Sequence, residues 1–165
     1  MKTVKRSIIF VFTLVLSSFF LHAEVLLPSE SVSKLLQQYY SLKDALIKSD
    51  ATLSAKEAEK MLHLTEKISA SKVPDKELVE KLKVSLKKIS EASDLDIQRK
   101  EFKPLSENMH AFIAFSGYKH KKVYVQHCPM ALGNQGGVWL SNEKEIRNPY
   151  FGDKMLKCGV VQEEL

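Results

Sequence analysis

Cysteine, methionine and histidine side chains gather near the C-terminus, between residues 127 and 158. The chain has five Met and two Cys in 165 residues, yet each Cys has a Met two or three positions away. Thiolate, thioether and imidazole are soft ligands, which suit Cu(I) or Ag(I) better than Mg²⁺ or Ca²⁺. We therefore predict a soft-metal site formed by His127, Cys128, Met130, Met155 and Cys158.

The spacing within each group is compatible with shared ligation. Cys128 and Met130 flank Pro129, which stiffens the backbone between them. Met155 and Cys158 are three residues apart, which would place both side chains on one face of a helical turn. Zinc is a weaker alternative, because the second Cys or His pair of a structural zinc site is missing.

Two other interpretations of the cysteines stay open. In an exported protein Cys128 and Cys158 could form a disulfide, with both methionines buried in the core. They could also be two buried thiols with no function. Trp139, the only tryptophan, is expected to anchor the core of this region, although its ring could also flank a bound Cu(I).

Residues of the same types elsewhere are assigned to the scaffold. His63 and His110 fall on predicted helices and are expected to be surface or core residues, and Met61 and Met109 fall on apolar stripes. The common hydrolase, nucleotide-binding and metalloprotease motifs are missing from the sequence. His127 and Cys128 are adjacent, so they are poorly placed to act as base and nucleophile. We therefore expect no enzymatic activity.

The N-terminus has the features of a secretory signal peptide over residues 1–23. Lys2, Lys5 and Arg6 precede an apolar run from Ile8 to Leu21, and Ala23 offers a cleavage point. The run is shorter than the roughly 20 residues that a transmembrane helix needs, so stable membrane insertion is not expected, although an uncleaved anchor stays open. This segment has three basic residues and no acidic ones, so its removal would lower the net charge from +5 to about +2. A nucleic-acid partner is therefore not expected either.

Residues 24–117 predict a bundle of about four helices. Apolar residues at intervals of three and four follow Ser29, Ser54, Pro74 and Asp94, and Ser54 with Glu57 resembles a capping box. Pro104 should kink the fourth helix or split it, and Gly117 should end it. Short connections between the helices favour an up-down arrangement.

Residues 118–165 predict an irregular cap that forms one domain with the bundle. Val123-Tyr124-Val125 is β-branched and strand-like, and Val138-Trp139-Leu140 is the longest apolar cluster. Glycines and Asn148-Pro149 mark the turns between them. The expected fold is thus mainly α, with a C-terminal cap of short strands and turns that carries the predicted metal site.

Several runs of residues carry a family resemblance. The strongest are residues 124–131, 139–141, 145–146, 148–156 and 158–159, and weaker support comes from residues 42–46, 96–100, 102 and 105–106. Through them the sequence resembles an exported bacterial domain of unknown function, number 3347, over about residues 32–161. Cys128, Met130, Met155 and Cys158 all match the family pattern. Some members of that family are fused to the periplasmic adaptors of copper and silver efflux pumps, which implies a copper-related periplasmic role.

Together these observations predict an exported protein that binds Cu(I), or Ag(I), as a chaperone or buffer for efflux or resistance. The expected partner is an efflux adaptor or another periplasmic protein with Met or Cys ligands. The alternative is a non-metal interaction module whose cap is closed by a Cys128–Cys158 disulfide.

Overall fold

The computed structural model describes residues 29–69 and 75–165. The predicted signal peptide and Pro74 lie outside these residues. The elements are α1 (Ser29–Ile47), α2 (Ala51–Ser69), α3 (Lys76–Glu91), α4 (Leu95–Ser116), β1 (Tyr124–Cys128), α5 (Ala131–Asn134), β2 (Gly137–Ser141), η1 (Gly152–Lys154) and β3 (Val160–Glu164).

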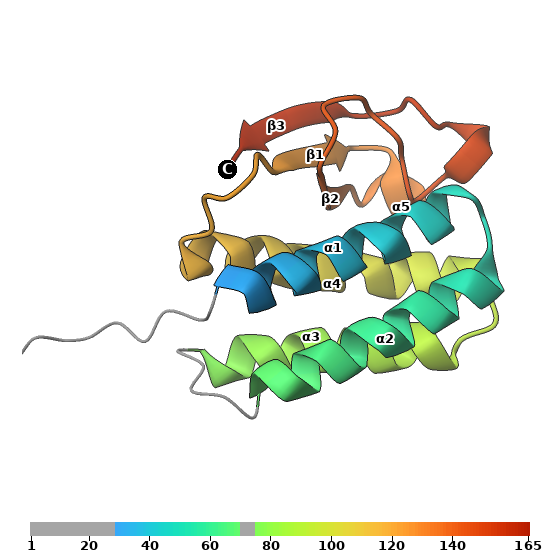
Figure 1. The fold of residues 1–165 in the computed structure, drawn as a ribbon. Helices are drawn as coiled ribbons and strands as arrows, with labels where there is room; N and C mark the ends of the chain where they lie inside the picture. Colours follow the sequence, from blue (N-terminus) through green and yellow to red (C-terminus); the bar gives the residue numbers. More distant parts are fainter. Residues whose placement is uncertain (1–28, 70–74) are drawn as a thin grey trace, which may run out of the picture.

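The four long helices form the predicted bundle and run in alternating directions (Figure 1). Each packs on its neighbour in sequence, and α1 also contacts α4. The α1–α4 pair lies beneath the sheet, while α2 and α3 form the layer farthest from it (Figure 1). The predicted apolar stripes form the core, which includes Met61 and Met109, both fully buried. None of the helices within the described ranges is long and apolar enough to cross a membrane.

Aspartate side chains start three of the helices. Leu53 N–H donates to Asp50 Oδ1 at 2.8 Å, Leu78 N–H donates to Asp75 Oδ1 at 2.9 Å, and Asp94 Oδ1 accepts from two amides of α4. Such caps satisfy amides that have no partner within the helix.

The predicted capping box was therefore wrong. Ser54 lies inside α2, where its hydroxyl donates to the Asp50 carbonyl, because Asp50 starts the helix earlier than expected. Glu57 instead accepts hydrogen bonds from Gln38 and Lys60. The hydrogen bond from Gln38 to Glu57 links α1 to α2.

The fourth helix is not split at Pro104. It continues from Leu95 to Ser116 and ends, as predicted, at Gly117, which has a φ of 64°. A proline removes one backbone donor, and the packing of α4 on α3 and β2 maintains the helix around it. The unbroken helix is long enough to support both the bundle and the sheet.

The C-terminal segment is more regular than the predicted cap of strands and turns. Its three strands form an antiparallel sheet in the order β2-β1-β3. β1 and β2 contain the two expected apolar segments, except that Val123 lies just before β1, whereas β3 was not predicted. The chain reaches β3 through Gly159, and this mostly exposed strand is organised by its pairing with β1.

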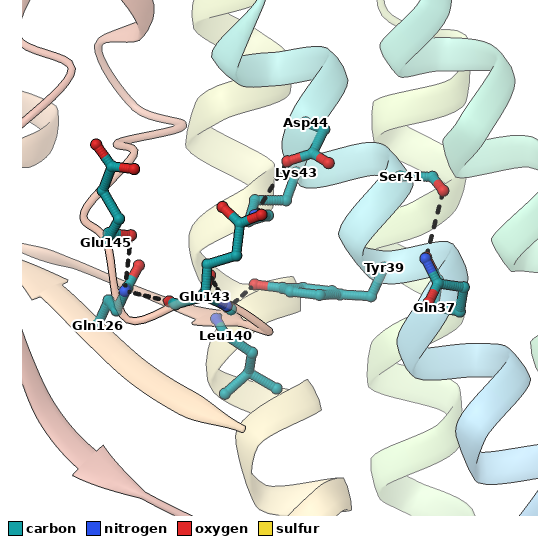
Figure 2. A network of polar contacts seen from close by, with 10 residues as sticks. Gln37, Tyr39, Ser41, Lys43, Asp44, Gln126, Leu140, Glu143 and Glu145 are labelled. Carbon is teal, nitrogen blue, oxygen red and sulfur yellow. Dashed lines mark hydrogen bonds and ion pairs between the residues drawn. The ribbon is translucent and has the colours of Figure 1, made fainter. Parts of the chain in front are cut away.

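The outer edge of β2 is held by two tyrosine hydroxyls, one from α1 and one from the loop before η1. Leu140 N–H donates to the Tyr39 hydroxyl at 3.1 Å (Figure 2), and this hydroxyl is also hydrogen-bonded to Ser106 Oγ at 2.7 Å. The Tyr150 hydroxyl donates to the Val138 carbonyl at 2.7 Å. Unpaired backbone groups of an edge strand are thereby satisfied by side chains.

The loop after β2 is held by one buried amide. Gln126 Nε2 donates to the carbonyls of Glu143, Lys144 and Glu145 at 2.9–3.2 Å (Figure 2). Because Gln126 lies on the central strand, the loop is fixed relative to the sheet.

Adjacent tyrosines of α1 provide a matched test of this docking. Tyr39→Phe leaves Leu140 N–H and Ser106 without their shared partner, so we expect it to lower the free energy of unfolding by about 1–3 kcal/mol. Tyr40 is also buried, but its hydroxyl has no hydrogen-bond partner among the described residues. Tyr40→Phe should therefore have little effect or stabilise the protein. Urea denaturation measures both, and equal losses would contradict this role of Tyr39.

Candidate functional site

Two thiols meet at the end of the sheet. The Sγ atoms of Cys128 and Cys158 are 2.8 Å apart, and both cysteines are free. Cys128 is the last residue of β1 and is fully buried, whereas Cys158 precedes β3 and is partly exposed. Antiparallel pairing of β1 with β3 brings them together across 30 positions of sequence.

Gly159 allows the chain to enter β3 closely against β1. Its φ is 142°, and a Cβ atom there would lie 2.9 Å from both the His127 carbonyl oxygen and the ring of Trp139. A larger residue would push the segment that carries Cys158 away from the sheet. The glycine therefore allows the segment that carries Cys158 to lie close to the end of β1.

Asn148 holds the loop that carries Cys158. Its Nδ2 donates to the Cys158 carbonyl at 2.8 Å, and its Oδ1 accepts from the Tyr150 N–H at 2.8 Å. Its own N–H donates to the Leu156 carbonyl. The sequence marked Asn148-Pro149 only as a turn, because the partners of a buried amide cannot be recognised from residue type.

His127 does not join the thiols. Successive side chains of a strand point to opposite faces, so His127 and Cys128 diverge. The Nε2 atom of His127 lies only 3.0 Å from where a Cβ on Gly136 would be, which places the ring beside the turn before β2.

The two methionines lie on separate turns. Met130 precedes α5 and is 48% exposed. Met155 follows η1 and is partly buried, and its carbonyl accepts the Cys158 N–H at 3.0 Å. Met155 has a φ of −147°, so the predicted helical turn from Met155 to Cys158 was wrong.

The five predicted ligands are therefore brought together only in part. The cysteine sulfurs touch, but neither methionine sulfur has a hydrogen bond to them in the described segments. Within residues 29–69 and 75–165, no three His, Cys, Asp or Glu side chains gather as they would around a metal ion. A metal held here would depend on the thiol pair.

The surroundings of the thiols are apolar on the buried side. Trp139 is fully buried, as expected for a core anchor, and packs edge-on against Tyr150 with ring centroids 6.1 Å apart. Its ring also contacts the chain at Gly159, next to Cys158. The single tryptophan thus lies close enough to the site to report changes in it.

The contact between the thiols changes the acidity of Cys158. The hydrogen bond with Cys128 raises the pKa of the Cys158 thiol, and burial and the charge of a second thiolate act in the same direction. Two thiolates in contact would repel each other. The contact therefore favours the protonated form of Cys158 until a cation or an oxidant acts on it.

A comparison with protein families identifies the helical part of the chain. Residues 35–121 match the family described as "Protein of unknown function (DUF3347)". The chain belongs to the DUF3347 family. No curated protein and no solved structure matches it.

The DUF3347 match spans most of α1, all of α2–α4 and the following loop, and it ends before β1. The thiol pair lies beyond it, in the segment on which the sequence resemblance mainly rested. The helical bundle is therefore the part of the chain that the family match covers, and the thiol pair lies outside it.

Titration of Cys158 tests the thiol contact. In the reduced protein the rate of alkylation by iodoacetamide should rise with pH around a midpoint above the usual thiol pKa of about 8.5. Cys128→Ala removes the hydrogen bond and the like charge, so the midpoint should move down and the rate at neutral pH should increase. An unchanged midpoint would mean that the sulfurs are not in contact in solution.

Asn148→Ala tests the loop clamp. It leaves the Tyr150 N–H and the Cys158 carbonyl without their partner, so we expect a loss of about 1–3 kcal/mol in the free energy of unfolding. Asn142→Ala changes an exposed asparagine near the same sheet and should cost little. Urea denaturation compares the two variants, and similar values would argue against the clamp.

Proposed function

We propose that this protein binds a soft monovalent metal ion, Cu(I) or Ag(I), through Cys128 and Cys158. The observation that carries the proposal is the direct contact between the two sulfurs at 2.8 Å. Thiolates are the preferred ligands of such ions. A bound cation would also neutralise the two thiolates, whose charges otherwise oppose each other.

The thiol contact leaves room for a metal after a small movement. Two sulfurs that ligate one ion tetrahedrally at about 2.3 Å lie about 3.8 Å apart, so the pair would have to open by about 1 Å. Cys158 is on a loop and partly exposed, and can supply this movement. Met155, close in sequence to Cys158, is the better candidate for a third ligand. Met130 would have to approach from the other turn, and His127 starts from the opposite face of β1.

Partial exposure of one ligand favours a role in transfer. A partner with Met or Cys groups could displace Cys158 first while buried Cys128 still held the ion. In this proposal the protein is an exported chaperone or buffer in the periplasm, linked to copper or silver efflux, and its partner is an efflux adaptor or a similar metal-binding protein. The signal-like N-terminus and the family resemblance support this location, and the role requires no catalysis.

A disulfide-closed interaction module is the second candidate, and the same distance favours it. Sulfurs at 2.8 Å need to approach by less than 1 Å to form a bond of about 2.05 Å. With 30 positions between the cysteines, the chain-entropy description gives a stabilisation of about 3–4 kcal/mol. The closed cap would then dock on an envelope complex without binding metal.

Metal binding and redox state separate the two candidates. We expect the reduced protein to bind one equivalent of Cu(I) in competition with a Cu(I)-specific chelator, with a rise in thermal stability that grows with free metal. Trp139 fluorescence should change in parallel. Cys128→Ser and Cys158→Ser should each abolish this rise while costing little stability in the reduced, metal-free state. If both serine variants bind Cu(I) like the parent, the metal proposal fails.

Conservative substitutions assign the remaining ligands. Met155→Leu keeps volume and apolarity, so weaker Cu(I) binding at nearly unchanged stability would identify its thioether as a ligand. Met130→Leu and His127→Asn should have smaller effects, because Met130 is largely exposed and the His127 ring lies beside Gly136. A larger loss in His127→Asn than in Met155→Leu would require a different arrangement of the site.

A further inference from the structure

A hollow lies between the start of α4, the short helix α5 and the segment that includes η1. It has a volume of about 320 Å³ and is lined by Asp96, Arg99, Leu132, Gly133, Tyr150, Phe151 and Lys154. This volume is at the lower end of the range for small-molecule sites, about 300–1,000 Å³. The thiols are not part of its lining.

A buried guanidinium contributes to the wall of this hollow. Arg99 is only 7% exposed, and its Nε and Nη2 donate to the carbonyls of Pro149 and Leu46 and to the Ser49 hydroxyl. Its Nη1 has no hydrogen-bond partner among the described residues, and no carboxylate lies within ion-pair distance of it there. Burying a charge without a counter-ion is costly, so this arrangement favours an anion.

The other charges of the lining leave it positive. Lys154 has no ion-pair partner in the described part of the chain, and Asp96 is the single acid of the lining. Burial lowers the pKa of Arg99, while the charge of Asp96 acts in the opposite direction. Arginine remains protonated in any case. Two cations therefore face one carboxylate.

The remaining lining is apolar and locally strained. Leu132 has a φ of 51°, in the left-handed region that a leucine rarely adopts, and Gly133 follows with a φ of 68°. The Tyr150 hydroxyl already donates to the Val138 carbonyl, so it is not available to a ligand. Tyr150 therefore contributes only its aromatic ring to the lining, beside Leu132 and Phe151. Backbone strain of this kind is found more often at binding sites than elsewhere.

We propose that this hollow binds a small organic carboxylate. One carboxylate oxygen accepts from Arg99 Nη1, Lys154 adds electrostatic attraction, and the apolar body of the ligand lies against Leu132 and Phe151. The mixed lining favours such a ligand over inorganic phosphate, which has no apolar part. This proposal does not rest on the proposed metal site, because neither thiol lines the hollow.

Benzoate, with benzamide as its neutral analogue, tests this proposal in the purified protein. Titration followed by ¹H–¹⁵N NMR should show saturable shifts at Leu132, Gly133, Phe151 and the Arg99 side chain. Benzamide should bind about tenfold more weakly, because it lacks the charge that Arg99 recognises. Equal affinities, or shifts located elsewhere, would overturn the proposal.

Substitutions of charged residues in the lining test the role of charge without relying on a variant that could fail to fold. Lys154→Gln should weaken benzoate binding about two- to fivefold, and Lys157→Gln, which is outside the lining, should leave it unchanged. Asp96→Asn removes the opposing charge and should strengthen binding by a similar factor. An affinity that rises in Asp96→Asn cannot come from misfolding. If neither Lys154→Gln nor Asp96→Asn alters the affinity, the hollow does not recognise an anion.

Discussion

The Tyr39 hydroxyl connects the two layers of this protein. It accepts the Leu140 N–H and is hydrogen-bonded to Ser106 on α4, while its ring stacks on Phe102 with centroids 5.4 Å apart. An edge-strand amide buried against helices would be costly without such a partner. Burial also raises the pKa of this phenol far above its usual value, so it stays neutral and able to donate. The position of the sheet on the bundle follows from this contact.

The strand order then decides where the thiols lie. β2 is held against the helices, β1 is central, and β3 is farthest from the bundle (Figure 1). Cys128 at the end of the central strand is consequently buried, whereas Cys158, on the approach to the outer strand, keeps contact with solvent. A thiol pair with one protected and one accessible member suits either reversible metal binding or a redox-controlled bridge.

The helices also support the loop that carries Cys158. Arg99 on α4 donates to the Pro149 carbonyl, next to Asn148, and to the end of α1. Gly152 leaves the space for this approach, since a Cβ there would lie 2.9 Å from Arg99 Nη2. The family-matched bundle is thus more than an attached scaffold, because its side chains position the segment beyond the match.

The sequence by itself determined the helical part of this protein. The apolar stripes, Asp94, Gly117 and the cores around Met61 and Met109 were predictable because helical periodicity and caps depend on residues close in sequence. The start of α2 was misjudged because Asp50 and Ser54 are both good caps, and only the hydrogen bonds of the folded chain distinguish them.

Only the tertiary structure decided the sheet and the site. β3 is short and mostly exposed, so its two valines and three polar residues give no periodic signal, and it is organised by its pairing with β1. The sequence placed five soft side chains near one another along the chain, but strand alternation turned His127 away from Cys128. Long-range pairing, which residue spacing does not encode, brought Cys128 against Cys158. The roles of Asn148 and Arg99 depend in the same way on partners that are distant in sequence or on a neighbouring loop.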